Sequence, residues 1–364
     1  MATTMKSLTV YYESSILKTK IEDIPIPVPG PKEVLIKVHY AGSNPKDWKH
    51  PLSHFYNNAV NQGDDCSGTI SALGPGVKSF QLNERVAGFH RMDEPHDTYA
   101  EFAICPAHTV FRIPATMSYA EAATIPLVAY TAAVGLYRNL KLPAPWERRD
   151  PHAPDGTETI PLVINAASAA VGAFATKLAK SNPRISPIIT TAGSSKEFVE
   201  GLGVDAVIDY RAPDVEEQIR TALHGKELHH VLDATNTLQS VKYLTSSLSP
   251  GSGSRYTCFA MLPPDQDSIL KADSGIWHEI TFVGDVHGQA LIVDPDQEIK
   301  AGGEIFGRIM SQVFESMCEE GTLKGHPFEV NEKGLEGVLD VLMELKERKR
   351  GGNRKFVTRI ASDD

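Results

Sequence analysis

The pattern of hydrophobic and polar positions divides the chain into a strand-rich beginning and a longer region in which strands alternate with helices. In the beginning, short apolar runs are separated by proline and glycine. These runs are LTVYY at 8–12, EVLIKVHYAG at 33–42, GTISALGPGV at 68–77 and ERVAGF at 84–89. Such spacing is typical of short strands joined by turns. It predicts a small, mostly antiparallel β-barrel, with a tight turn at Gly74 and Gly76.

The pattern changes at Ala120, where small and apolar residues begin to recur at helical spacing through AEAATIPLVAYTAAVGLYRNL. Ser118 is placed to cap the N-terminus of this predicted helix. The stretch at 141–161 that follows is rich in Pro, Asp and Arg and shows no periodicity. It predicts a surface loop.

Apolar runs and helical patterns then alternate. The successive pairs are PLVINA with GAFATKLAKS, SPIITTA with SKEFVEGLG, AVIDY with VEEQIRTALHG, and HHVLDAT with LQSVKYLTSSL, followed by the strand RYTCFAM. This alternation predicts a parallel sheet with helices on both faces, a doubly wound α/β fold. Helices at 303–320 and 334–348 and a last strand, KFVTRI, suit a chain that returns to the first domain.

A chain of 364 residues is longer than one hydrophobic core usually organises. We therefore expect two domains, the first built from residues 1–125 and 286–364 and the second from 126–285. Hydrophobic residues make up 41% and charged residues 23% of the chain, which is typical of a folded protein.

Charge and targeting signals narrow the class of partner. The formal net charge of −10 gives no general attraction to nucleic acid or to anionic membranes. The N-terminus has no apolar signal region, and we expect no run long enough to span a bilayer. Four scattered cysteines form no CxxC pair, which indicates reduced, buried thiols: Cys66, Cys105, Cys258 and Cys318. These features favour a cytoplasmic protein that binds a small molecule.

A turn of small residues follows the first strand of the α/β region. Leu162–Asn165 leads into Ala-Ala-Ser-Ala-Ala-Val-Gly at 166–172 and then into a helix that ends near Lys180. A dinucleotide fold needs small residues here, because a bulky side chain would hold a pyrophosphate away from the helix N-terminus. The match to the GxGxxG fingerprint is degenerate, and a plain small-residue helix start remains the alternative.

The end of the next strand bears on the choice of nucleotide. A carboxylate there accepts hydrogen bonds from the ribose 2′-hydroxyl of NADH and repels a 2′-phosphate. Here the strand ends in Ala-Gly-Ser-Ser-Lys at 192–196, and the first carboxylate is Glu197. Two hydroxyls and an ammonium suit a phosphate, so NADPH is favoured. The alternative is that Ser194 caps the next helix and Lys196 is solvated.

Four stretches together resemble the medium-chain dehydrogenase/reductase superfamily, in its zinc-free quinone oxidoreductase and fungal enoyl reductase branch. They are GSNPKDWK at 42–49, GDDCSG at 63–68, AATIP at 122–126 continuing to TAAVGLY at 131–137, and the small-residue turn. The resemblance covers essentially the whole chain. It implies a GroES-like catalytic barrel and a Rossmann nucleotide-binding domain.

The resemblance also implies that zinc is absent. Zinc-dependent relatives place a cysteine in the early barrel segment, a His-Glu pair after the position of Gly63, and a four-cysteine lobe later. This chain has Asn44-Pro45 and Asp64-Asp65 at the first two places and no cysteine lobe. A catalytic zinc needs about three protein ligands. His50 and His54 lack a third ligand, so we interpret them as ordinary surface histidines.

The resemblance further implies a set of cofactor contacts. Asn44, Pro45, Lys46 and Asp47 would border the nicotinamide ribose, and Thr131, Phe259 and Ala260 the nicotinamide. Ser168, Ala169, Ala170 and Val171 would face the pyrophosphate. Gly193, Ser194, Ser195, Lys196 and Tyr210 would surround the 2′-phosphate and adenosine. Phe356 and Val357 would close the cleft. Tyr210 and the two phenylalanines are alternatively packing residues.

Without zinc, alcohol oxidation has no Lewis acid, whereas hydride addition to an activated double bond or a quinone needs only a proton or hydrogen-bond donor. In the fungal enoyl reductases a lysine follows Asp-Trp, and Lys49 holds that place here, either as the catalytic donor to the enolate or as a surface lysine paired with Asp47. The segment Gly284, Asp285, Val286, His287 and Gly288 would line the substrate channel. His287 is either a proton donor or a structural residue.

Three functions remain open. The first is a stand-alone NADPH-dependent reductase of enones, enoyl thioesters or quinones. The second is a trans-acting enoyl reductase that receives its substrate from the carrier domain of a fungal polyketide synthase. The third is a cofactor-binding protein without turnover. The chain would act as a monomer or a homodimer.

Overall fold

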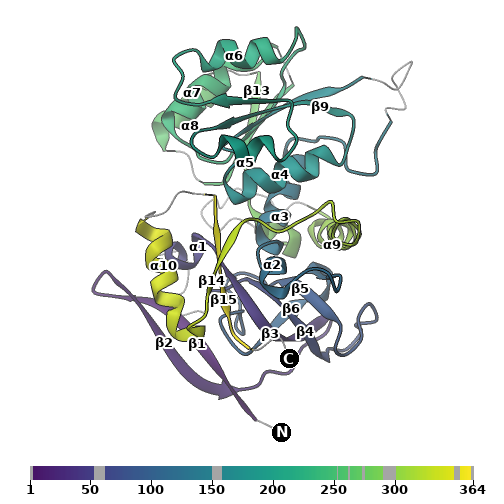
Figure 1. The fold of residues 1–364 in the computed structure, drawn as a ribbon, viewed down its shortest axis with the longest axis vertical. Helices are drawn as coiled ribbons and strands as arrows, with labels where there is room; N and C mark the ends of the chain where they lie inside the picture. Colours follow the sequence, from purple (N-terminus) through teal and green to yellow (C-terminus); the bar gives the residue numbers. More distant parts are fainter. Residues whose placement is uncertain are drawn as a thin grey trace. The chain divides into compact units, whose positions relative to one another are not determined.

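The computed structural model describes residues 3–52, 62–149, 158–251, 253–260, 263–272, 275–289, 301–347 and 353–361. The chain divides into two compact units (Figure 1). Unit 1 contains Met1–Leu127 and Gly284–Asp364, and unit 2 contains Val128–Val283. The limits predicted from the sequence were 125 and 285.

Unit 1 is built on strand β3 (Glu33–Ser43), which pairs with three other strands. The sheet runs in the order β14-β15-β3-β4-β5-β7, with β6 also paired to β3. The other strands of this sheet are β4 (Asp65–Leu73), β5 (Arg85–Phe89), β6 (Phe102–Pro106), β7 (Val110–Arg112), β14 (Phe328–Asn331) and β15 (Lys355–Arg359). Among the described residues, the strand pairings of this sheet are antiparallel except that of β14 with β15. The predicted antiparallel strands are therefore present.

An antiparallel hairpin of β1 (Thr4–Glu13) and β2 (Ile16–Pro25) precedes the strands of this sheet in the sequence. Strand β1 buries Leu8 and Val10 in the core of unit 1, together with Val34, Ile36 and Val38 of β3. The sequence analysis did not predict β2, because most of its residues are partly or fully exposed and give no alternating pattern.

The predicted helix from Ala120 is interrupted. It forms as α2 (Tyr119–Ala122), α3 (Pro126–Ala133) and a π-helix, η3 (Val134–Asn139). Ser118 caps α2 as expected, because its Oγ accepts a hydrogen bond from the backbone N–H of Glu121 at 3.1 Å. The break precedes Pro126, which has no N–H to donate and restricts the residue before it.

Contrary to the expectation from the sequence, the run Tyr119–Asn139 has the length and composition of a membrane span, with a mean hydropathy of 1.2. However, 94% of this window is buried inside the protein. Its apolar composition is therefore explained by burial in the protein core.

Unit 2 contains a six-stranded parallel sheet in the order β10-β9-β8-β11-β12-β13. The strands are β8 (Ile160–Asn165), β9 (Ile185–Ala192), β10 (Ala206–Asp209), β11 (His230–Asp233), β12 (Ser254–Cys258) and β13 (Ile276–Ile280). The helices between them are α4 (Ala170–Lys180), α5 (Lys196–Glu200), α6 (Val215–Ala222), α7 (Leu238–Ser247) and α8 (Pro264–Ala272). Counted along the chain this order is 3-2-1-4-5-6, that of the Rossmann fold.

The chain then returns to unit 1 through a 3₁₀-helix, η4 (Val283–His287), and α9 (Gly303–Glu319). The predicted helix at 334–348 forms as a 3₁₀ turn, η5 (Gly334–Gly337), followed by α10 (Val338–Glu347). Strand β15 then pairs with β3, and this pairing places Lys355 at the end of β3 that leads to Asn44.

Candidate functional site

The turn between β8 and α4 has the close packing that a dinucleotide site requires. A Cβ added to Gly172 would lie 2.5 Å from the carbonyl oxygen of Ala166 and 2.9 Å from Cα of Ala167, so only glycine fits. Ala166 has a φ of 58°, a conformation that glycine adopts more readily. Close packing of helix against strand is the role of the third glycine of the dinucleotide fingerprint, and Gly172 holds that place.

The first turn of α4 is open to an anion. Helix α4 has Ala169 at its N-cap, with no side-chain cap hydrogen bond, and no acidic residue in its first turn. Ser168, Ala169, Ala170 and Val171 are all half-buried. The N–H groups and the positive end of the helix dipole therefore lie where a pyrophosphate would fit.

Buried polar side chains connect the ends of β8 and β11, which form the topological switch point of the sheet. The Asn165 amide donates to Asp233 Oδ1 at 2.7 Å and to Thr235 Oγ1 at 2.7 Å. Asp233 Oδ2 accepts hydrogen bonds from Tyr256 and Ser240, each at 2.7 Å. This network holds the crevice in a fixed shape, and the sequence analysis did not single it out.

The residues predicted to surround the 2′-phosphate come together at the ends of β9 and β10. These strands pair with Ala192 opposite Asp209, so Gly193 and Tyr210 are neighbours. A Cβ on Gly193 would lie 3.0 Å from the ring of Tyr210. Tyr210 is 43% exposed, which does not fit a purely packing role.

Two cations lie in the same region of unit 2. The Lys196 ammonium is 3.7 Å from Glu200, and both side chains are exposed. Ser195, rather than Ser194, is the N-cap of α5, and it makes no side-chain cap hydrogen bond. Arg211, which the sequence analysis missed, donates to both oxygens of Asp209 at 2.8 and 2.6 Å. Its position next to Tyr210 in the sequence is the signal that would have identified it.

The remaining predicted residues of unit 2 have separate environments. Thr131 is buried in α3. Phe259 and Ala260 follow the end of β12 at Cys258. The carbonyl of Ala260 accepts a hydrogen bond from the Asn236 amide at 2.8 Å, and Phe259 lies beside Gly135.

In unit 1, Asn44 is held by partners at both ends of its amide. Its Nδ2 donates to Asp65 Oδ2 at 2.8 Å, and its Oδ1 accepts from the Lys355 ammonium at 2.9 Å. Lys355 also donates to Asp65 at 2.9 Å, and the other oxygen of Asp65 accepts from the N–H of Leu127 at 2.6 Å. Asp65 and Lys355 were not predicted as site residues.

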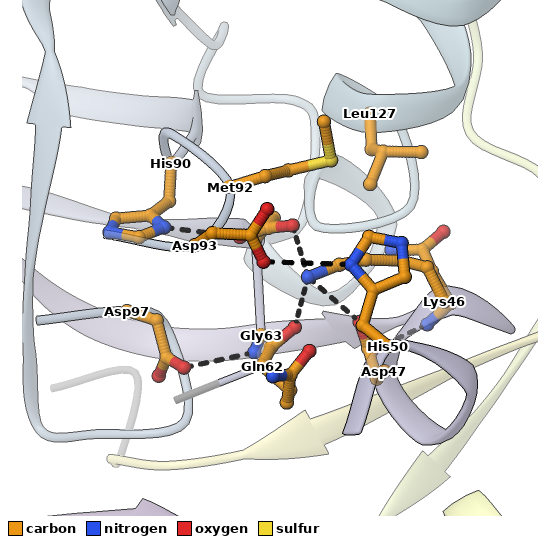
Figure 2. Close-up of polar contacts among 12 residues, drawn as sticks. Lys46, Asp47, His50, Gln62, Gly63, His90, Met92, Asp93, Asp97 and Leu127 are labelled. Carbon is orange, nitrogen blue, oxygen red and sulfur yellow. Dashed lines mark hydrogen bonds and ion pairs between the residues drawn. The ribbon is translucent and has the colours of Figure 1, made fainter. Parts of the chain in front are cut away.

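Lys46 and Asp47 point into a buried cluster of charges (Figure 2). The Lys46 ammonium donates to the carbonyl of Gln62 at 2.6 Å, is 3.4 Å from Asp47 Oδ1, and forms an ion pair with Asp64. Asp64 also contacts His90 Nδ1 at 3.1 Å. The side chains of Lys46 and Asp47 thus lie in the interior of unit 1.

The charged groups in this cluster shift one another's pKa values. Burial opposes the charge on Lys46, but Asp64 and Asp47 outweigh it and raise the pKa of Lys46 above its ordinary value. Burial also opposes ionisation of Asp64, yet Lys46 and His90 lower the pKa of that carboxyl. Burial raises the pKa of Asp47 to about 7 despite Lys46, and it raises the pKa of Asp97 well above the usual range.

Lys49, the predicted catalytic lysine, is exposed at the end of α1 (Lys46–Lys49). Its ammonium lies 5.5 Å from the centroid of the Trp48 ring. Asp47, the partner proposed in the surface alternative, accepts hydrogen bonds from the backbone of Asn44 and from Tyr99. Lys49 is therefore exposed to solvent, while Lys46 provides the cation beside Asp47.

The predicted substrate segment 284–288 belongs to unit 1 and is mostly buried. His287 is 3% exposed, its Nε2 is 3.0 Å from Thr109 Oγ1, and its ring stacks on Phe89. Burial lowers the pKa of His287 well below its ordinary value, so the imidazole is uncharged at neutral pH and is not available as an imidazolium acid. The geometry favours the structural alternative for His287.

Two other predicted residues are buried by strand pairing. Phe356 and Val357 of β15 pair with Ser43 and Gly42 of β3. Val357 is completely buried in unit 1, whereas Phe356 remains 9% exposed. Val357 is therefore mainly a packing residue.

The residues at the position of the zinc ligands do not fit a zinc ion. Asp64, at the place of the histidine, is paired with the ammonium of Lys46, which would compete with a metal. Cys66 is fully buried, with its Sγ 3.9 Å from the carbonyl of Gly88. Within the described ranges, no group of three His, Cys, Asp or Glu side chains could hold a metal ion. His50 is 3.7 Å from Asp93, and His54 lies outside the described residues.

Two domain families match the chain. The alcohol dehydrogenase GroES-like domain matches residues 30–115, and the zinc-binding dehydrogenase family matches residues 170–300. These matches fall in the barrel and in the Rossmann sheet, respectively. Both parts of the predicted fold class are thus confirmed.

Two similar proteins are trans-enoyl reductases of fungi. The trans-enoyl reductase fsr4 of Gibberella fujikuroi is 37% identical over 335 residues, which cover 90% of this chain and 91% of that protein. The trans-enoyl reductase gkaC of Penicillium citrinum is 30% identical over 346 residues, which cover 91% of each chain.

Solved structures share the fold along the whole chain. The CurK enoyl reductase aligns with a TM-score of 0.74 at 22% identity, covering 98% of this chain and 99% of that one. The quinone oxidoreductase of Coxiella burnetii aligns with a TM-score of 0.70 at 18% identity, covering 98% and 100%. With these matches, the chain belongs to the enoyl reductase branch of the medium-chain dehydrogenase/reductase superfamily.

Proposed function

We propose that this protein is a trans-acting, NADPH-dependent enoyl reductase that reduces the activated C=C bond of an enoyl thioester carried by a polyketide synthase. The observation that supports it most is the turn at Gly172, which is open to a pyrophosphate at the switch point of a Rossmann sheet. The similarity to trans-enoyl reductases, such as the one from Gibberella fujikuroi at 37% identity, supports the substrate class. We also propose that the reaction takes place in the cytoplasm.

Residues of unit 2 could hold the cofactor. The N-terminus of α4 would hold the pyrophosphate, and the network of Asn165 and Asp233 would keep the switch point rigid. The reduced nicotinamide supplies a hydride when it is bound. We also propose that the reaction needs no zinc, because the Lys46 ammonium takes the position beside Asp64.

The preference for NADPH rests on the region after β9. The strand ends in Ala192 without a carboxylate, and Ser194, Ser195 and Lys196 follow it. The neighbouring Tyr210 would stack on the adenine, and Arg211 adds a second cation to the region. Hydroxyl and cationic groups bind a 2′-phosphate, whereas an acidic residue at this position would repel it.

Lys49 is the proposed donor in the chemical step. Hydride addition to the β-carbon moves the electron pair of the C=C bond towards the thioester carbonyl and gives an enolate. The exposed Lys49 ammonium would hydrogen-bond the enolate oxygen, and its proton would pass to the α-carbon, directly or through water. Lys49→Ala should lower kcat by about 10²–10³-fold and leave the affinity for NADPH unchanged.

The test is NADPH oxidation with three kinds of acceptor: an enoyl chain on a polyketide synthase carrier domain, the same chain on N-acetylcysteamine, and a simple quinone or enone. We expect fast turnover of the carrier-bound chain and slow turnover of the free thioester. Faster reduction of quinones or simple enones than of the carrier-bound chain would instead show a stand-alone reductase. Binding of NADPH without any turnover would show a cofactor-binding protein.

A titration of NADPH against NADH tests the cofactor separately. We expect tighter binding of NADPH, and a loss of this preference in Lys196→Ala and in Ser195→Asp, where a carboxylate would repel the 2′-phosphate. Equal affinities for the two nucleotides in the unmodified protein would refute the 2′-phosphate argument.

A further inference from the structure

Lys46 is an unusual residue, because its ammonium lies in the interior of unit 1 among several acidic groups. The side chains of Lys46 and Asp64 are 13% and 1% exposed, and that of Asp47 is completely buried. A buried lysine is expensive unless partners compensate its charge. The partners here are two carboxylates and the carbonyl of Gln62.

These partners come from separate segments of the chain. Asp47 and Lys46 belong to α1, Gln62 and Asp64 precede β4, and His90, which contacts Asp64, follows β5 (Figure 2). Three oxygens, two from carboxylates and one from a carbonyl, face the same ammonium. Such a set of oxygen donors around a positive charge is the arrangement of a cation site.

One carboxylate oxygen of Asp47 lies beside the Lys46 ammonium. This oxygen, Oδ1, is buried without a hydrogen-bond partner and lies 3.4 Å from the Lys46 nitrogen, while Oδ2 accepts from Tyr99 at 2.8 Å and from the N–H of Asn44 at 2.8 Å. The orphaned oxygen is thus directed at the cation. The same carboxylate anchors the backbone of Asn44, so the position of the cation is coupled to the start of α1.

We infer that the Lys46 ammonium is a built-in cation that occupies a buried cation site formed by Asp47, Asp64 and the carbonyl of Gln62, and that it positions the Asn44–Asp47 segment in place of a metal ion. Lys46 is therefore a positioning residue. The inference concerns the architecture of unit 1, and it holds whether or not the chain reduces enoyl thioesters.

The proposal predicts that an external ammonium ion can replace the side chain. Lys46→Ala in the full chain should leave the site vacant and lower the Tm by about 10 °C, because a buried charge loses its partner. Propylammonium chloride should restore at least about half of this loss. Tetramethylammonium chloride at the same concentration carries the same charge but no N–H donor, so it should restore none.

The matched control is Lys37→Ala, which removes an exposed lysine from β3. Its Tm should neither fall nor respond to propylammonium. An unchanged Tm in Lys46→Ala, or equal responses to propylammonium and tetramethylammonium, would overturn the proposal. Equal responses to the two ammonium ions are what we expect if the Lys46 side chain only fills space.

A second variant covers the case in which Lys46→Ala does not fold. In the double variant Lys46→Ala, Asp64→Asn the carboxylate no longer needs a cation, so this protein should fold and have a higher Tm than the single variant. If the double variant is no more stable than Lys46→Ala, or fails to fold as well, the cation role of Lys46 is refuted.

Discussion

At the scale of single residues, buried lysines of unit 1 compensate some of its buried carboxylates but not all of them. Lys355 compensates Asp65, and Lys46 compensates Asp64. Asp47 and Asp97 are further buried carboxyls, and both have raised pKa values because burial disfavours their ionised forms. Loss of one partner from a buried ion pair typically costs about 3–5 kcal/mol, so each lysine is essential to its cluster.

The raised pKa of Asp47 gives a pH-dependent stability. The carboxyl titrates near its ordinary pKa of 3.8 when the chain is unfolded and at about 7 when it is folded, with Lys46, Asp64 and Tyr99 around it. Its contribution to stability is therefore complete at low pH and is lost as the pH rises through about 7. One pKa unit corresponds to about 1.4 kcal/mol, which limits the total effect to a few kcal/mol.

Asp47→Asn isolates this effect, because an amide of the same shape does not titrate. Relative to the unmodified protein, the variant should gain stability as the pH is raised from about 5.5 to about 8.5, measured by urea unfolding at each pH. The comparison of two proteins at one pH cancels the other titrating groups. A stability difference that does not change with pH would contradict the prediction.

At the scale of elements, the turn between β8 and α4 sets the distance between helix and strand. Gly172 lies against the backbone of Ala166, and Ala166 has a positive φ that costs a residue with a Cβ about 1–2 kcal/mol. The hydrogen bond from the N–H of Ala166 to Thr191 Oγ1, at 2.9 Å, helps to hold this conformation. The turn is thus kept compact at some cost in stability.

Gly172→Val should therefore abolish tight nucleotide binding. The added side chain would collide with the Ala166 carbonyl and push α4 away from β8, which separates the N–H groups of the helix from the pyrophosphate. We expect the Kd for NADPH to rise at least about tenfold, about 1.4 kcal/mol, in a calorimetric titration. Gly201→Val serves as a control, because Gly201 is an exposed glycine of unit 2 outside this turn with a φ of −62°. Both variants must show the circular dichroism of the folded protein.

Periodicity predicted the elements whose burial is regular. The first five strands of the sheet in unit 2 and the four helices between them are present in the predicted order, because parallel strands covered on both faces read as continuous apolar runs. Helix α8 and the sixth strand, β13, were not predicted. The exposed strand β2 and the break before Pro126 were missed, since neither produces a regular pattern.

The site residues likewise divide into those that could be predicted from the sequence and those that could not. Gly193 and Tyr210, predicted from the resemblance, are neighbours because β9 and β10 pair in parallel. Lys355, Asp65 and Asn165 were not found as site residues, since their contacts join segments far apart in the sequence, such as Lys355 with Asn44. Only the tertiary structure brings such charges together.

At the scale of the whole molecule, the chain combines a fold shared with zinc-binding dehydrogenases and a charge distribution that leaves little room for the metal. The Lys46 ammonium is paired with Asp64, and the Lys355 ammonium is paired with Asp65. Both carboxylates that stand in place of the His-Glu pair of zinc-dependent relatives therefore have a fixed cation. A zinc ion would need to displace a buried lysine, and the buried charge of that lysine would then lack a partner.

Prolonged treatment with EDTA or 1,10-phenanthroline should consequently leave both NADPH turnover and the Tm of the protein unchanged. The reason is electrostatic, because each site carboxylate is already neutralised by a lysine of the same chain. Elemental analysis of the purified protein should find zinc well below one ion per chain. A loss of activity on chelation that is reversed by added zinc, but not by added magnesium, would show that a metal supports the reaction after all, and that the two lysines play a different part.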